Sequence, residues 1–312
     1  MPSEAILAAF ADELARNLGT YSELSPILGV QLDGTIDLGG GISLEAEPDE
    51  MMDSLAHRIP FQRLPVSTGT SVLRQRYTVR PAFELRGGEA IRESITMPAS
   101  AAREEVRQQV RLACLLASVG PVELPFLLLQ PDPESLFVAG EGNQAGRPFG
   151  AMPLVAFPVA GANVARAYRG LVGFKGGASL ARAIDRLGRS RLAASPVDRA
   201  LDLGMAAEIV LMHDHSPANT EIAHKIGGRA AWLLGRDPDD RAAISADMKA
   251  LYQARSQAVH SGVLTKSKID LDAADRLVTR AFNAILERGA FPDWTSLVMG
   301  GGALQAEEDA PG

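Results

Sequence analysis

Apolar residues recur at intervals of three and four through positions 200–290, which is the spacing of one buried face of an α-helix. Turn signals divide this region, because Gly235 and Gly289 suit helix ends and Asp237-Pro238 suits a helix start. The pattern predicts four helices, at residues 200–213, 220–234, 238–262 and 272–288. The C-terminal part of the chain is therefore predicted to be an all-α four-helix bundle.

The N-terminal half has a different pattern, in which apolar and polar residues alternate over short runs. In residues 71–80, for example, Leu73, Tyr77 and Val79 share one face of a strand and basic side chains take the other. The predicted elements are strands at 71–80, 122–129 and 152–159 and a helix at 100–118. Asp33-Gly34 is a hairpin signal, and the glycines 39–41 predict a second turn. These elements predict a mixed α/β domain, and the chain as a whole is predicted to be α+β.

These patterns divide the chain into three parts. Residues 1–160 form a mixed α/β accessory or sensor domain, and residues 163–290 form the helical domain. The tail, residues 300–312, is rich in Gly, Ala and acidic residues and is predicted to be disordered.

Composition limits the class of protein. The formal net charge of −7 argues against a protein that coats nucleic acid indiscriminately. The single cysteine, Cys114, excludes an internal disulfide and fits a reducing, cytoplasmic setting, and its apolar surroundings indicate a buried, inert thiol. No apolar run has the length of a membrane-spanning helix, so no membrane association is expected.

Arg255 and His260 are the residues with the clearest chemistry, and they lie near the end of the third predicted helix. A guanidinium offers a planar fork of donors to phosphate oxygens, and an imidazole exchanges a proton near neutral pH. The pair therefore suits cleavage of a phosphodiester. The alternative is structural, since both cations also favour the C-terminal end of a helix dipole.

Three segments, one of which contains this pair, resemble the sequence pattern of a known family. They are residues 202–211 (DLGMAAEIVL), 221–235 (EIAHKIGGRAAWLLG) and 251–260 (LYQARSQAVH). In this order and spacing, the chain resembles the ApeA-like branch of the HEPN superfamily, a group of all-helical domains that includes ribonucleases of defence systems. The chain departs from the family pattern in Ser256, where many active members have Asn or Asp, and in Ser261 before Gly262.

The resemblance implies a metal-independent endoribonuclease that works as a homodimer, with RNA, including tRNA, as substrate. His260 is then the general acid or base, Arg255 stabilises phosphoryl charge, Ser256 assists by hydrogen bonding and Glu208 supports the pair. Five positions on a continuous helix turn two side chains about 140° apart. Either the helix ends between Arg255 and His260, or residues of two chains complete the site. The resemblance also suggests an antiviral defence or toxin-like system.

Other interpretations stay open. A non-catalytic HEPN module that binds RNA or a protein partner, as a sensor or scaffold, is the main alternative to the nuclease. Residues 163–199 are strongly basic and either steer RNA or form a solvated helix face. A metal site is the minority alternative at four clustered residues, His213, Asp214, His215 and His224. The sequence predicts neither a metal nor a cofactor.

Overall fold

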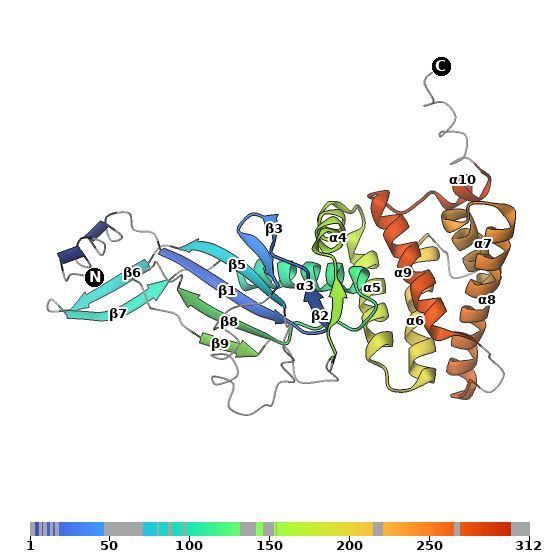
Figure 1. Ribbon diagram of the computed structural model, residues 1–312, viewed down its shortest axis with the longest axis horizontal. Coiled ribbons are helices and arrows are strands. Elements are labelled where there is room, and N and C mark those ends of the chain that lie inside the picture. Colours follow the sequence, from blue (N-terminus) through green and yellow to red (C-terminus); the bar gives the residue numbers. More distant parts are fainter. Residues whose placement is uncertain are drawn as a thin grey trace, which may run out of the picture. The chain divides into compact units, whose positions relative to one another are not determined.

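The chain has a mixed α+β architecture, which confirms the expected fold class at that level (Figure 1). The computed structural model describes residues 4–5, 8, 11–12, 15, 19–46, 71–79, 81–86, 89–95, 98–131, 142–145, 153, 155–214, 221–264 and 269–300. Two compact units are present. The first consists of Met1–Arg111 and Val122–Ala165, and the second of Leu112–Pro121 and Arg166–Gly312. Residues 112–121, which the sequence placed in the accessory domain, thus belong to the helical unit.

A six-stranded antiparallel sheet forms the centre of the first unit, in the order β3-β4-β5-β1-β8-β9. These strands are β1 (Gly19–Ile27), β3 (Ile36–Gly39), β4 (Ile42–Glu45), β5 (Ser71–Val79), β8 (Phe126–Pro131) and β9 (Gly142–Ala145). Two smaller pairs accompany it. They are β2 (Val30–Leu32) with β10 (Phe157–Val159), and the hairpin β6 (Pro81–Arg86) with β7 (Glu89–Ile95).

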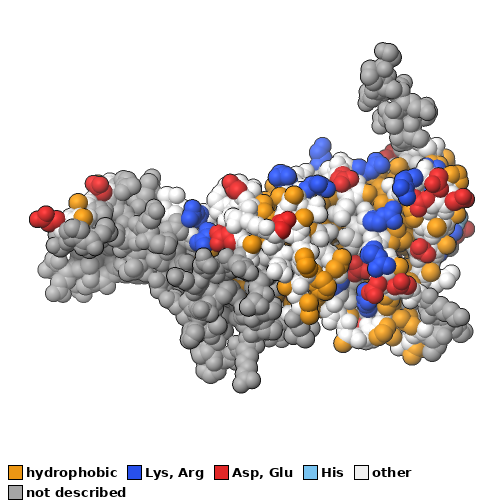
Figure 2. All heavy atoms as spheres, in the orientation of Figure 1, with side chains coloured by type: hydrophobic (Ala, Val, Ile, Leu, Met, Phe, Trp, Pro, Cys, Tyr) orange, Lys and Arg blue, Asp and Glu red, His pale blue; other side chains and the backbone are white. Residues whose placement is uncertain are grey.

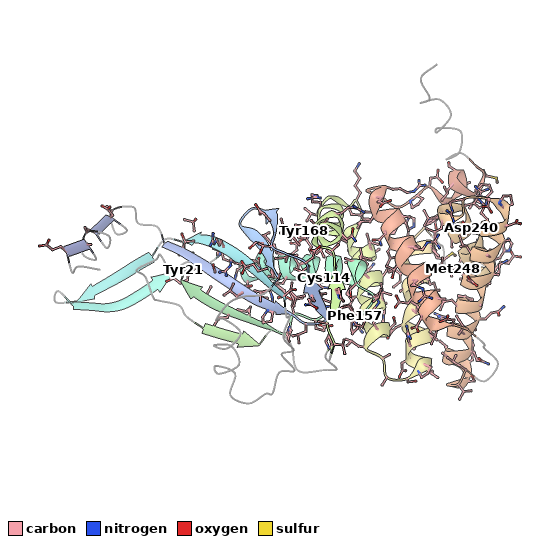
Figure 3. The ribbon with its side chains drawn as sticks, viewed as in Figure 1. Tyr21, Cys114, Phe157, Tyr168, Asp240 and Met248 are labelled. Atoms are coloured by element: carbon pink, nitrogen blue, oxygen red, sulfur yellow. The ribbon has the colours of Figure 1, made fainter. Side chains whose placement is uncertain are left out.

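The central strand pair β1–β5 is long and regular, with partners from Gly19↔Val79 to Ile27↔Ser71. Burial along β5 follows the predicted alternation, because Leu73 and Val79 are buried whereas Arg76 and Thr78 are exposed. The strand predicted at residues 71–80 is therefore confirmed. Tyr21, labelled in Figure 3, lies on β1 and is fully buried.

The Asp33-Gly34 hairpin prediction is wrong. The strand before this turn, β2, pairs in parallel with β10, whereas the strand after it, β3, pairs with β4. The glycines 39–41 form the hairpin turn instead, since all three have positive φ, a conformation that costs glycine little. The carboxylate of Asp33 accepts a hydrogen bond from the Gly161 N–H at 2.9 Å, so this aspartate is used in a long-range contact.

Helix α3 (Ser100–Ala117) confirms the helix expected at 100–118, and its first part interacts with the sheet through arginines. Arg103 forms an ion pair with Glu23 of β1, whose side chain is completely buried. Arg107 donates to the Leu124 carbonyl at 2.9 Å, and Arg111 pairs with Glu123 at 3.1 Å. The strand expected over 122–129 begins only at Phe126, because Glu123 forms an isolated bridge with Leu28.

Helices make up the second unit. They are α4 (Gly161–Gly173), which begins in the first unit, α5 (Gly177–Leu192), α6 (Pro196–Leu211), α7 (Ile222–Leu234), α8 (Pro238–Ser261), α9 (Leu271–Glu287) and α10 (Trp294–Val298). The four helices predicted from apolar spacing correspond to α6–α9. Side-chain caps at Ser195, Asp237 and Asp270 fix where three of them begin.

The core of the helical unit lies between the apolar faces of α5–α9. Met248 of α8, labelled in Figure 3, is 1% exposed, and Phe282 of α9 is fully buried. Helix α5 packs along α6 and adds a fifth helix to the expected four.

Some expectations fall on parts that the structure does not describe. The tail beyond Gly300 lies outside the described residues, so its predicted disorder stays a prediction. Among the described residues, no helix is both long and apolar enough to cross a membrane.

Candidate functional site

Arg255 and His260 lie on a single uninterrupted helix, α8, which extends to Ser261. Gly262 ends it with a φ of 66°, and its N–H donates to the Ala258 carbonyl at 3.1 Å. The helix therefore does not end between the two residues. Their side chains leave the helix about 140° apart and about 7.5 Å apart along its axis. Of the two arrangements that the sequence allowed, the one with a helix break is excluded.

The guanidinium of Arg255 is held against α6. Its Nη2 lies 3.1 Å from Oε2 of Glu208, and the two side chains are 25% and 27% exposed. The Tyr252 ring centroid lies 5.8 Å from the guanidinium carbon, at the outer range of a cation–π contact. The structure thus brings Glu208 and Arg255 together, as the sequence suggested for a supporting carboxylate.

Gly204 explains how α6 and α8 come this close. A Cβ atom at this position would overlap with Cβ and Cγ of Arg255. Only glycine leaves room for the arginine stem to cross the helix at this point. Gly204 stood in one of the matched segments, but the spacing of apolar residues gave no sign of this contact.

The Glu208–Arg255 contact leaves polar atoms unsatisfied. Among the described residues, Nε of Arg255, Oε2 of Glu208 and Oε1 of Gln257 are buried atoms without a hydrogen-bond partner. The ion pair brings Glu208 and Arg255 within 3.1 Å without aligning a hydrogen bond. Unsatisfied buried groups are costly, but they also occur away from this pair, at Oγ of Ser25 and Nε of Arg199.

His260 is exposed, next to the exposed apolar side chains Val259 (52%) and Val263 (45%). No hydrogen-bond partner of its imidazole is found in the described part of the chain. Ser256 is half-buried beside Arg255, also without a side-chain hydrogen bond to a described residue. Within one chain, His260 and the Arg255–Glu208 pair therefore stand on different sides of α8.

Two of the four residues of the metal alternative, His213 and Asp214, are engaged in other contacts. Nδ1 of His213 accepts a hydrogen bond from Nε1 of Trp294 at 2.9 Å, and the imidazole stacks on Phe291 with ring centroids 4.1 Å apart. Both carboxylate oxygens of Asp214 accept from Arg229, at 2.6 and 3.1 Å. His215 lies outside the described residues, and no group of three metal-type ligands occurs within them.

Burial and the nearby Arg229 both affect the pKa values of His213 and Asp214. Burial is the main cause that lowers the pKa of His213; the Arg229 charge adds to it and the Asp214 carboxylate opposes it. For Asp214, burial alone would raise the pKa, but the hydrogen bond and charge of Arg229 outweigh it and lower the pKa. Sequence reasoning missed this cluster, because Phe291 and Trp294 follow the last predicted helix and carry no periodic signal.

Much of the basic segment 163–199 is neutralised. Arg186 pairs with Asp202 at 2.7 Å, Arg189 with Asp185 at 3.0 Å and Arg199 with Asp272 at 2.6 Å. Arg191 is buried against Asp275. These arginines fasten helices to each other or stabilise their own helix, which favours the structural interpretation for this part of the segment.

Cys114 has the character that its surroundings predict. The thiol is fully buried, and burial raises its pKa to about 12. A thiol with this pKa carries almost no thiolate near neutral pH, so Cys114 is not a nucleophile.

Comparisons with known proteins give no relative. No protein-family model matches the chain, and no significant match is found among curated proteins or solved structures. Any assignment of function therefore depends on the residues and their geometry.

Proposed function

We propose that the helical unit is an ApeA-like HEPN four-helix bundle and that the chain is a metal-independent endoribonuclease active as a homodimer. The proposal rests chiefly on the position of Arg255. Its guanidinium lies 3.1 Å from the Glu208 carboxylate, and it shares one continuous helix with the exposed His260. Helices α6, α7 and α8 contain the three segments of the resemblance in their expected order.

The proposed reaction needs no metal. The 2′-oxygen of a ribose attacks the adjacent phosphorus, and the bond from phosphorus to the 5′-oxygen of the next nucleotide breaks. The imidazole of His260 accepts the 2′-hydroxyl proton, and the leaving 5′-oxygen takes a proton from solvent, which leaves a 2′,3′-cyclic phosphate. Arg255 donates to the non-bridging oxygens, Ser256 adds a hydroxyl donor and Glu208 fixes the guanidinium.

The helix geometry supports a dimer. Because Arg255 and His260 diverge by about 140° on α8, one chain does not aim both at one phosphate. Two copies related by a twofold axis place the Arg255 of each chain beside the His260 of the other. Each of the two sites of the dimer then combines the His260 of one chain with the Arg255 of the other.

A second candidate is a non-catalytic HEPN module that binds RNA or a protein partner. The ion pair itself favours it, since a guanidinium already faced by Glu208 gives a phosphate less electrostatic stabilisation. In both cases the first unit acts as the sensor or accessory part. The proposed setting is a cytoplasmic antiviral defence or toxin-like system.

RNA cleavage in EDTA tests the proposal. The wild type is compared with Arg255→Gln, His260→Ala and the matched control His224→Ala, an exposed histidine on α7. A tRNA-containing pool is the substrate, product ends are mapped, and dimer formation is checked by light scattering. We expect cyclic phosphate ends from the wild type and from His224→Ala only. Cleavage that survives His260→Ala would refute the assignment, and RNA binding without cleavage by a folded dimer would favour the second candidate.

A further inference from the structure

Exposed cations without an ion-pair partner gather on two helices of the second unit. They come from the part of α4 after Ala165, the turn that follows it, and α9 with its C-cap. No carboxylate of the described residues is within ion-pair distance of any of them. The six are Arg166, Arg169, Lys175, Arg276, Arg280 and Arg288.

These six differ from the arginines between them in sequence. Arg186 and Arg199 are committed to carboxylates of α6 and α9, and Arg189 to Asp185 one turn before it. The basic segment thus contains arginines paired with carboxylates and exposed cations that have no such partner. Arg182 of α5 is also exposed and has only the Ser179 hydroxyl as a hydrogen-bond neighbour among the described residues, but it lies outside the α4 and α9 group. Only the cations without a carboxylate partner have charge available for a ligand.

The two groups of cations belong to one surface, because α4 and α9 meet. A Cβ at Gly170 would touch the Leu286 side chain at 2.7 Å, and the Lys175 N–H donates to the Gly289 carbonyl at 3.0 Å. The rings of Phe174 and Phe291 contact edge to face at 5.2 Å between centroids. Figure 2 shows Lys and Arg side chains gathered over α4 and α9 on the same face.

This surface is positively charged, although the formal net charge of the whole chain is −7. Arg276 and Arg280 stand one turn apart on the outer face of α9, about 6 Å along its axis. Two acids share that face. Asp272 is already paired with Arg199, so Glu287 is the unpaired one. Asp270, the N-cap of α9, also lies close enough to Arg276 to interact with its charge. The six cations still outnumber Asp270 and Glu287, so the surface attracts polyanions.

We infer that this surface, the α4–α9 basic surface, binds the phosphate backbone of single-stranded RNA. Arginine side chains donate in pairs to phosphate oxygens, and a row along a helix suits successive phosphates. The choice of RNA rests on the proposed function, whereas the location rests on the unpaired cations alone. The surface holds the substrate strand outside the residues that cleave it.

Binding of a labelled, unstructured 20-nucleotide RNA tests the inference. All chains carry His260→Ala, so that the probe stays intact during the titration. The test variant combines Arg169→Gln, Arg276→Gln and Arg280→Gln. The control combines Arg182→Gln, Arg189→Gln and Arg236→Gln, which removes equal charge from exposed arginines outside this surface. Arg189 and Arg236 have ion pairs with carboxylates four residues away, and Arg182 donates to the Ser179 hydroxyl. Anisotropy is followed over a range of salt concentrations.

The test variant is expected to bind about tenfold more weakly at low salt, and its log K against log[salt] slope is expected to be shallower by about 2. The control keeps the affinity and slope of the parent chain within about twofold. Equal weakening by both triple variants, an unchanged slope in the test variant, or binding of anionic vesicles in place of RNA would each overturn the inference. If RNA binds as expected but the wild type cleaves none, the proposed function fails while the surface stands.

Discussion

The guanidinium of Arg191 and the carboxylate of Asp275 form a two-pronged ion pair inside the helical unit, with Nε–Oδ2 at 3.0 Å and Nη2–Oδ1 at 2.7 Å. The side chains are 3% and 8% exposed. The remaining nitrogen, Nη1, donates to the carbonyls of Leu115, Ser118 and Gly120. One side chain of α5 therefore joins α9 to the end of α3 and holds residues 112–121 in this unit.

Breaking this pair is expected to destabilise the helical unit strongly. Asp275→Ala should lower the free energy of unfolding by about 3–5 kcal/mol, because it leaves a buried guanidinium without its counter-charge. Both tryptophans, Trp232 and Trp294, lie in this unit, so urea unfolding followed by tryptophan fluorescence reports on it. Arg189→Ala is the control, since its ion pair is 58% exposed on the arginine side and should cost under about 1 kcal/mol. Similar losses in both variants would contradict the role assigned to Asp275.

Gly204→Ala is expected to force α6 and α8 apart where Arg255 crosses. The added methyl overlaps with the Arg255 stem, so we expect a loss of about 1–3 kcal/mol in stability and reduced RNA cleavage. Gly228→Ala is the matched control within α7, because nothing lies within 4 Å of the added atom. It should gain about 0.5–1 kcal/mol from helix propensity. Urea unfolding measures the change in stability of both variants. Equal changes in the two variants would contradict close packing at Gly204.

The His213–Trp294 bond is expected to make stability depend on pH. Trp Nε1 only donates, so Nδ1 of His213 must be unprotonated to accept this bond. With its pKa lowered in the fold, His213 binds a proton more readily when unfolded. Its contribution is therefore complete above the unfolded pKa, about 6.5, and is lost as the pH falls below that value toward the folded pKa.

Thermal unfolding between pH 7.5 and 5.5 measures this effect. Trp294 fluorescence, isolated by Trp232→Phe, should change as the pH falls, and the melting temperature should drop. His213→Asn should be less stable at pH 7.5 and show a flatter pH dependence, whereas His224→Ala should keep the wild-type profile. If the melting temperature of His213→Asn depends on pH as strongly as that of the wild type, His213 is not the group that titrates.

Mixing two variants tests whether the proposed nuclease site is shared between chains. Arg255→Gln and His260→Ala are each expected to be inactive alone. After unfolding and refolding together, a mixed dimer contains one site with Arg255 from one chain and His260 from the other. About a quarter of all sites should then be active. No recovery, with mixed dimers present on native gels, would place Arg255 and His260 of a single chain in one site.

How far the sequence predicted the structure differs between elements. The starts and ends of α7, α8 and α9 follow from apolar spacing, the Asp237 cap and glycine stops, because these signals act within a few residues. The Asp33-Gly34 hairpin failed because Val30–Leu32 gains its partner from Phe157–Val159, more than a hundred residues away. The turn preference of Asp33-Gly34 does not depend on that distant strand pairing and therefore cannot predict it.

The candidate site divides in the same way. The sequence alone determined Arg255 and His260 near the end of one predicted helix, the apolar spacing of the helical part and an acidic chain with a basic segment. Only the tertiary structure decided that α8 continues past Arg255, that Gly204 lets Glu208 face Arg255, and which arginines remain unpaired. The reason is physical. Helix periodicity and caps are set by neighbours in sequence, whereas ion pairs and close helix crossings depend on side chains that folding brings together from distant positions.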